Sequence, residues 1–308
     1  VSEFERVINS LRMKFDVSIF ITGSNGKLLS GELATYLSGR YVSFLVMPFS
    51  FREMCEIRKV QPESATEEML LEYMEWGGMP QRFQLTDQEQ VKTFLRDVYD
   101  TIVLRDIVQR AGIRDVDVFN RLIEYLACNP SQTVSVKSIS DYFMSVERKI
   151  SRETIYNYLE NITASMIMRK VSRYDVRGKC ILTKMEKYYL TDTGLGRVRN
   201  SGFKLEMGAL LENIIYNELI VRGYDVYVGK TRKSEVDFVA VRGNEKEYYQ
   251  VAYYLYDQKV IDREFGAFRE IEDNYPKYVI SLDKMDFSRD GIIHKNAVRF
   301  LTEESEKK

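Results

Sequence analysis

The sequence predicts a multi-domain α/β protein. At about 150 residues per domain, its 308 residues correspond to two or three domains with buried cores. Apolar runs typical of strands alternate along the chain with segments whose apolar residues recur at helical spacing. The composition, 44% hydrophobic and 30% charged, is ordinary for a globular protein.

Charge, cysteine and histidine content exclude several classes of protein. The net charge of −1 gives the whole chain no electrostatic attraction to nucleic acid or to membranes. Cys55, Cys128 and Cys180 are far apart and form no CxxC pair, which predicts reduced thiols in a cytoplasmic protein. The single histidine, His294, excludes any multi-histidine metal site. No run approaches the ~20 apolar residues of a membrane span, so we expect no membrane association.

The first unit opens with an amphipathic helix over residues 4–11. The near-continuous apolar run over residues 17–22 predicts a strand buried on both faces of a parallel sheet. A polar glycine turn over residues 23–27, a helix over residues 28–37 and a second strand over residues 42–47 follow. A helix with no strand before it suggests that the chain begins part-way through a domain.

The next unit, to about residue 129, has only helical periodicity. We expect a short helix over residues 67–76, stopped by two glycines, and a long helix that is capped near residue 86 and extends to about 107. A third helix is expected over residues 118–128. These helices are predicted to form a core and nothing more.

A winged helix is predicted next. A helix over residues 136–146, a helix over 153–164 capped by Ser151, and strands over 167–174 and 188–191 have its order. Between residues 148 and 187, ten Lys or Arg side chains stand against four acids. Winged helices place a helix in the major groove and wing residues on phosphates, so we expect DNA binding. The expected DNA-binding residues are Arg148, Lys149, Arg152, Arg177 and Lys179. The alternative is a protein-docking module, because charge runs are usually solvated faces.

The stretch over residues 208–256 is the one place where carboxylates are spaced as a site. An apolar helix with a single acid, Glu212, precedes a strand and a hairpin. Asp237 lies on the first hairpin strand, whereas Gln250 and Ala252 share a face of the second. Magnesium prefers oxygen ligands, which an acid from the helix and an acid from the strand can supply. This layout supports metal-dependent phosphodiester hydrolysis. A helix over residues 260–272, a strand over 277–282 and a final strand region over 291–301 complete the expected elements.

The order helix, strand and hairpin resembles the core of the PD-(D/E)XK, or restriction-endonuclease-like, superfamily. By position, Glu212 matches the helical acid, Asp237 the first strand acid and Gln250 the second acid position. The resemblance implies a catalytic site of these three residues, with Mg or Mn held by Glu212 and Asp237. Ala252 falls where the family has its lysine. The implied site is therefore degenerate, because a glutamine offers only a neutral oxygen and an alanine cannot assist an attacking water.

The missing lysine leaves several interpretations open. The domain is a degenerate nuclease fold used for recognition, or an active nuclease in which Lys230 or Lys246 replaces the lysine, or a protein-interaction module. In purely structural terms, Glu212 lies at a helix edge, and Glu235 and Asp237 are solvated strand residues.

A series of short motifs extends over nearly the whole chain. They are ITGSN (21–25), LSGRY (37–41), PFSFRE (48–53), GGMP (77–80), LRDIV (104–108), RYD (173–175), KYYLTD (187–192) and EVDF (235–238). Together they resemble a prokaryotic AAA-type ATPase family that fuses an ATPase core to an uncharacterised C-terminal domain. The resemblance implies that Thr22, Ser24 and Asn25 end the sensor strand, where a polar side chain orients water or reads the γ-phosphate. Arg40 is implied to contact a nucleotide phosphate.

The sequence lacks a phosphate-gripping GxxxxGK loop followed by Ser or Thr, and lacks an apolar strand that ends in two acids. The family places both ahead of Val1. The chain is therefore expected to be the part downstream of the nucleotide grip. ATP and Mg are expected to bind the full-length protein, and this chain alone is expected to be inactive.

The expected organisation follows from these patterns. Residues 1–62 are the partial AAA-type P-loop core, 63–130 a helical region, 131–200 a winged-helix domain and 201–308 a restriction-endonuclease-like α/β domain. The predicted role is ATP-linked regulation or DNA association, with DNA or another protein as the partner. The sequence does not reveal the oligomeric state.

Overall fold

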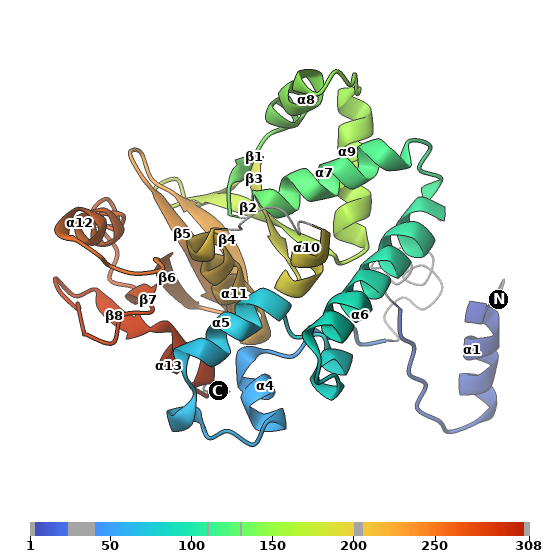
Figure 1. The fold of residues 1–308 in the computed structure, drawn as a ribbon, viewed down its shortest axis with the longest axis horizontal. Coiled ribbons are helices and arrows are strands. Elements are labelled where there is room, and N and C mark those ends of the chain that lie inside the picture. The colour runs from blue at the N-terminus through green and yellow to red at the C-terminus, as the bar shows by residue number, and fades with distance from the viewer. Residues whose placement is uncertain (1–3, 24–40, 110, 130, 200–205, 305–308) are drawn as a thin grey trace.

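A computed structural model describes residues 4–23, 41–109, 111–129, 131–199 and 206–304 (Figure 1). Its centre is one mixed eight-stranded sheet with the strand order β1-β3-β2-β4-β5-β6-β7-β8. Helices cover both faces of this sheet and extend beyond it on the side of β1. The α/β class predicted from the sequence is confirmed.

The sheet is formed by segments from the middle and the C-terminal third of the chain. β2 pairs with β3, β4 with β5, and β5 with β6 in antiparallel fashion, whereas β2–β4, β6–β7 and β7–β8 are parallel. The strands are β1 (Thr133–Val134), β2 (Met168–Asp175), β3 (Cys180–Leu190), β4 (Asp225–Lys230), β5 (Glu235–Arg242), β6 (Glu245–Val251), β7 (Lys277–Ser281) and β8 (Ile293–Asn296).

Most helices lie where the sequence pattern predicts them. The α-helices are α1 (Phe4–Lys14), α4 (Phe51–Ile57), α5 (Glu67–Trp76), α6 (Gln88–Asp100), α7 (Val116–Cys128), α8 (Val136–Ser145), α9 (Arg152–Ala164), α10 (Thr193–Arg199), α11 (Met207–Val221), α12 (Gln258–Gly266) and α13 (Ala297–Thr302). A π-helical segment, η3 (Thr101–Gln109), continues α6, and η1 (Pro62–Ser64) and η2 (Pro80–Gln84) are short 3-10 turns. Within the described ranges, no helix has the length and apolar content that a bilayer span requires.

Two C-terminal predictions need correction. The helix expected over residues 260–272 ends at Gly266, after which the chain runs as turns to β7. The strand region expected over residues 291–301 is a strand only to Asn296. The Asn296 side chain then accepts a hydrogen bond from the Arg299 backbone N–H at 3.2 Å and caps α13. A local N-cap therefore overrides the strand-like composition.

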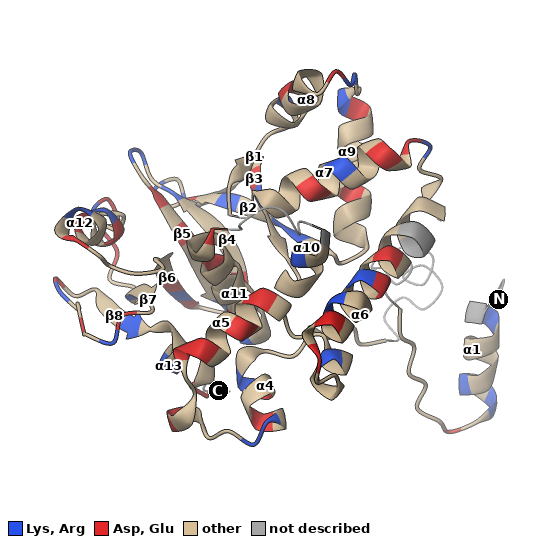
Figure 2. Ribbon diagram, viewed as in Figure 1, with Lys and Arg blue, Asp and Glu red and all other residues tan. Residues whose placement is uncertain are grey.

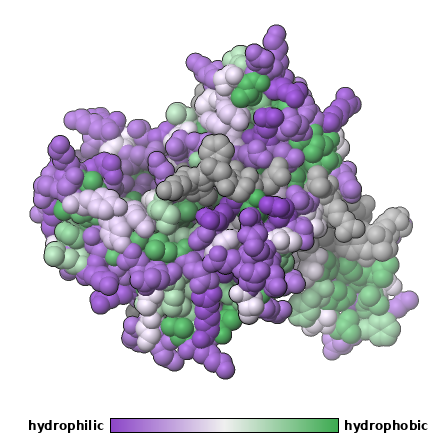
Figure 3. Space-filling view, in the orientation of Figure 1, coloured by the Kyte–Doolittle hydropathy of each residue, from purple (hydrophilic) through white to green (hydrophobic). Residues whose placement is uncertain are grey.

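The N-terminal strand predictions are wrong for the described residues. The runs over residues 17–22 and 42–47 form no strand, and Phe20 and Phe44 are 88% and 80% exposed. A buried parallel strand needs a hydrogen-bonded neighbour and helices over its faces, and no described strand pairs with either run. Figure 3 shows the resulting hydrophobic surface beside α1. The helix expected over residues 28–37 lies outside the described residues.

Two apolar cores sandwich the C-terminal part of the sheet. On one face, α4, α5, α11 and α13 pack against Phe238 and Ala240 of β5. On the other face, α12 packs against Val239 of β5 and Tyr248 of β6. A third core joins α6 to α10 with β3. Phe238 and Ala240 of β5 therefore pack on the side of α11, whereas Val239 packs on the side of α12.

The elements expected for a winged helix occur in the expected order, and their hairpin is part of the large sheet. β2 pairs with β4 through Tyr174 and Gly229 and through Asp175 and Lys230. The β2–β3 hairpin is therefore hydrogen-bonded directly to the strands of the C-terminal third. No sequence pattern predicted this pairing, because it joins residues more than fifty positions apart.

Candidate functional site

A cavity of about 540 Å³ opens at the start of β5, between α11 and α12. The three residues predicted from the sequence, Glu212, Asp237 and Gln250, all line it, together with Glu235 and Glu264. α11 supplies Glu212, the hairpin β5–β6 supplies Asp237 and Gln250, and α12 supplies Glu264. The structure thus brings the predicted residues together in an acidic pocket.

Where the β5–β6 ladder ends, the side chains of Asp237 and Gln250 bond to backbone groups of the two strands. The β5–β6 ladder stops at the Phe238–Tyr249 pair. Beyond it, the Val251 backbone N–H donates to Asp237 Oδ2 at 2.8 Å, and the Asp237 N–H donates to Gln250 Oε1 at 3.2 Å. These side chains replace the missing ladder bonds, so their backbone donors stay satisfied. Asp237 is buried in this position, and the interpretation of it as a solvated strand residue is wrong.

Lys187 of β3 is the residue that the sequence reasoning missed. Its side chain is 4% exposed, and its Nζ lies 2.8 Å from Glu235 Oε1 and 3.3 Å from Glu212 Oε1. Two positions further along β3, the Tyr189 hydroxyl donates to Glu212 Oε1 at 2.6 Å. The KYYLTD motif indicates only that Lys187 and Tyr189, two apart on a strand, share a face; which residues that face contacts depends on strand pairing.

Neither lysine proposed to replace the missing one reaches the cavity. The Lys246 ammonium lies over the rings of Tyr174 and Tyr275, 5.4 and 5.0 Å from their centroids. Lys230 ends β4 and, among the described residues, forms no ion pair with a carboxylate of the cavity. The cation comes from β3 instead, a strand that the hairpin pattern did not include.

The electrostatics of the cavity favour a charged lysine. Burial alone would lower the pKa of Lys187, but the carboxylates of Glu212, Asp237 and Glu235 raise it above its ordinary value. Burial, with the nearby charge of Glu212, raises the pKa of Asp237 well above its usual range, and Lys187 opposes this shift. The ammonium therefore supplies the positive charge that makes several buried carboxylates tolerable.

The remaining carboxylates of the cavity are also engaged. Arg173 Nη2 lies 3.4 Å from Glu235 Oε2. Glu264 accepts a hydrogen bond from Gln250 Nε2 at 2.9 Å and pairs with Arg263 at 2.5 Å. Oxygen donors suit a hard cation, yet the described residues contain no group of three or more His, Cys, Asp or Glu side chains that could hold a metal ion. Two of the carboxylates, Glu212 and Glu235, are instead paired with Lys187.

The other predicted residues lie elsewhere. Thr22 is exposed, and Ser24, Asn25 and Arg40 lie outside the described residues. Of the predicted DNA-binding side chains, Arg148, Lys149 and Arg152 are exposed around the turn between α8 and α9, where Arg148 pairs with Asp117 at 3.4 Å. The other two, Arg177 and Lys179, are exposed at the β2–β3 turn. The five cations thus form two separate groups.

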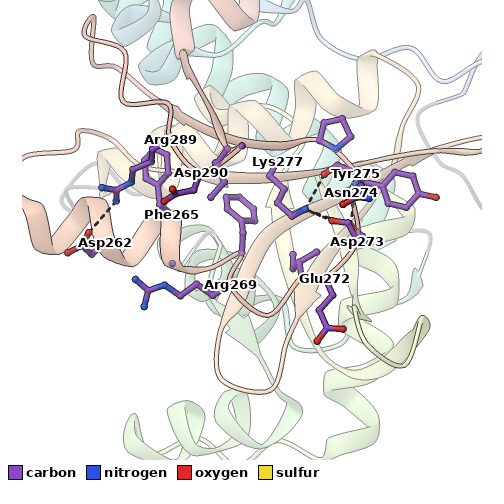
Figure 4. A pocket seen from close by; sticks show the side chains of 16 residues that line it. Asp262, Phe265, Arg269, Glu272, Asp273, Asn274, Tyr275, Lys277, Arg289 and Asp290 are labelled. Carbon is purple, nitrogen blue, oxygen red and sulfur yellow. Dashed lines mark hydrogen bonds and ion pairs between the residues drawn. The ribbon is translucent and has the colours of Figure 1, made fainter.

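A second cavity, of about 610 Å³, lies on the other side of α12 (Figure 4). Its charged groups are largely paired with one another. Arg289 contacts Asp262 at 3.2 Å and lies over the Phe265 ring, and Lys277 Nζ donates to the Asp273 carbonyl at 2.6 Å. These contacts hold the loops of the cavity together.

Comparison with known proteins defines the class. Residues 1–55 match a family described as an AAA domain, and residues 67–202 match a domain of unknown function, DUF8612. An AAA-type region is thereby shown at the N-terminal end of the chain.

Two relatives extend the comparison over most of the chain. It is 37% identical over 282 residues to an uncharacterized protein of Haemophilus influenzae, covering 91% of this chain and 70% of that protein. It is 32% identical over 265 residues to the uncharacterized protein MJ1544 of Methanocaldococcus jannaschii, covering 82% of this chain and 59% of that protein. The chain belongs to the family of the Haemophilus protein. No solved structure matches the chain.

Proposed function

We propose that this chain is the C-terminal portion of an AAA-type ATPase whose restriction-endonuclease-like domain recognises a partner and does not cleave it. The AAA match over residues 1–55 and the cavity at β5 and α11 support this proposal. In the full-length protein, ATP and Mg would bind near Thr22, Ser24, Asn25 and Arg40. The winged helix over residues 131–200 and the domain limits at 62, 130 and 200 are parts of the same proposal.

The position of Lys187 carries the recognition role. A nuclease site of this type uses its carboxylates to hold a metal ion, and the metal supplies the charge for hydrolysis. Here an ammonium lies between Glu212 and Glu235, within 3.3 and 2.8 Å. The carboxylates are thereby neutralised from within the chain. Gln250 and Ala252, at the positions of the second acid and of the lysine, support the same conclusion.

Plasmid cleavage tests this proposal. The chain and its Asp237→Ala variant are incubated with supercoiled plasmid and either Mg²⁺ or Mn²⁺. We expect neither protein to nick the plasmid above the level of a metal-free control. Cleavage by the parent that is lost in Asp237→Ala would overturn the recognition role and establish a nuclease.

An active metal-dependent nuclease is the second candidate. One observation favours it: the Lys187 ammonium contacts Glu212 and Glu235, two of the carboxylates that line the cavity, whereas the family's lysine position is occupied by Ala252. On this hypothesis, cleavage is lost in Lys187→Met and in Asp237→Ala. Lys230→Met, which changes a lysine outside the cavity, retains it. Equal activity of Lys187→Met and parent would exclude this candidate.

A further inference from the structure

Two hairpin turns lie next to each other at one end of the sheet. Because β2 and β4 are parallel neighbours, the β2–β3 turn and the β4–β5 turn leave the sheet at the same end. The Val176 backbone N–H donates to the Lys230 carbonyl at 3.0 Å and joins the two turns directly. Residues far apart in the sequence thus form one continuous edge.

This edge is basic. Five cations lie on it, which we call the basic ridge: Arg177, Lys179, Lys230, Arg232 and Lys233. All are exposed except Lys230, which is half-buried. Figure 2 shows Lys and Arg at the tip of the β4–β5 hairpin. In a chain with a net charge of −1, this is a local concentration of positive charge.

The carboxylates near the ridge bind backbone groups of the turns. Asp175 Oδ1 accepts from the N–H groups of Arg177 and Gly178 at 3.0 and 2.9 Å. Glu270 Oε2 accepts from the Lys233 N–H at 3.1 Å. Within the part of the chain that the structure describes, no carboxylate forms an ion pair with any of the five ridge side chains. Only Lys233 has a carboxylate, that of Glu270, close enough to interact with its charge, so most of the ridge's charge is available to a partner.

The chemistry of the ridge favours phosphates over a protein surface. Protein interfaces have an apolar core within a polar rim. None of the described residues over 175–179 or 229–234 is a large exposed hydrophobic side chain. Single-stranded nucleic acid is bound by stacking its bases on aromatic side chains, and the ridge offers none. The nearest exposed hydrophobic side chain is Ile181, at the start of β3, which is too little for an apolar interface core. Exposed Lys and Arg side chains in such surroundings are suited to the phosphate backbone of a duplex.

We propose that the basic ridge binds the phosphate backbone of duplex nucleic acid, without reading its sequence. This inference rests on the recognition role proposed above and names its partner and its surface. Ser234, next to Lys233, begins the lining of the acidic cavity with Glu235 and Asp237. A duplex on the ridge therefore lies along the mouth of that cavity.

The inference relocates the DNA contact expected from the sequence. A winged helix would use the side chains around the α8–α9 turn, of which Arg148 is paired with Asp117. The ridge shares only Arg177 and Lys179 with that expectation. It adds three cations from a hairpin that the winged-helix pattern did not contain.

Fluorescence anisotropy with a labelled 30-bp duplex in EDTA tests the ridge, because cleavage needs a metal and binding does not. The chain is compared with Arg232→Gln/Lys233→Gln and with the control Lys149→Gln/Arg152→Gln on the α8–α9 side. We expect the parent to bind with a steep salt dependence. The ridge variant should reduce the slope of log K against log salt by about 2, since each lost phosphate contact contributes about 0.9. The control should match the parent.

Three results would overturn the inference. They are absence of duplex binding by the parent, a ridge variant equal to the parent, and a loss confined to the control. Tighter binding of poly-glutamate than of duplex at equal salt would also overturn it and would indicate an acidic protein partner. Because binding is measured in EDTA and cleavage in Mg²⁺ or Mn²⁺, failure of the ridge and failure of the recognition role give different results.

Discussion

Two segments that the sequence pattern predicts to be strands adopt different structures in this molecule. The run over residues 17–22 in the AAA-matching segment is irregular, and Phe20 is 88% exposed. The run over residues 235–242 forms β5, and Phe238 is 0% exposed. β5 has hydrogen-bonded neighbours on both sides and helices over both faces, whereas the first run has none among the described residues. A strand-like pattern specifies a strand only where neighbouring elements complete it.

The largest difference in unfolding free energy is expected between two variants that each remove one phenylalanine ring, one in each segment. Phe238→Ala should lower the free energy of unfolding by about 3–5 kcal/mol, because the side chain leaves a cavity in a packed core. Phe20→Ala should stay within about 0.5 kcal/mol of the parent, as exposed substitutions usually do. Urea unfolding of both variants measures this. Equal destabilisation by the two substitutions would show that Phe20 has buried partners, and would contradict the difference described between the two segments.

A smaller loss of unfolding free energy is expected from removing the charge of Lys187. Lys187→Met leaves Glu212 without its cation and Glu235 with Arg173 alone, and should destabilise the fold by about 3 kcal/mol. The double variant Lys187→Met/Glu212→Gln should recover part of the loss, because the uncompensated acid is then neutral. Lys230→Met is the matched control, since Lys230 forms no ion pair among the described residues. If thermal unfolding shows the same loss of stability for Lys230→Met as for Lys187→Met, the role given to Lys187 is contradicted.

Asp192, which follows β3, gives the stability a pH dependence. Its carboxylate accepts from the Gly78 N–H at 2.7 Å, and the Gly78 carbonyl accepts from the Phe49 N–H at 2.9 Å. Burial raises the pKa of Asp192 to about 6. The folded state therefore holds a proton that the unfolded chain releases between about pH 4 and 6, and stability falls as the pH rises through that window.

The shift corresponds to about 3 kcal/mol. Asp192→Asn removes the titrating group, so the difference in unfolding free energy between parent and variant should change by roughly this amount between pH 4 and 7. Chemical denaturation across this range gives the difference directly. Parallel pH profiles for the two proteins would show that Asp192 titrates normally.

The smallest effect is expected at a helix cap. Ser50 and Glu53 form a capping box at the start of α4, directly after the exposed N-terminal segment. Ser50→Ala should cost about 1 kcal/mol. Ser43→Ala, in the exposed run, should have no measurable effect. Equal melting temperatures for the two variants would show that α4 does not depend on its cap.

The sequence predicted the local elements well and the long-range ones poorly. Helical periodicity and caps located α5, α7 and α9 to within two residues, because these signals are local. Glu212, Asp237 and Gln250, which the family resemblance places in one site, line one cavity in the structure. Lys187 was missed, because its position depends on β2–β4 pairing, which no local pattern encodes.

The most direct test of the central claim is a crystal structure of the chain soaked in MnCl₂, with data collected at the manganese absorption edge. We predict no anomalous peak in the cavity and the Lys187 ammonium between Glu212 and Glu235. A manganese ion bound by Glu212 and Asp237, with Lys187 displaced, would contradict the account and restore the nuclease interpretation.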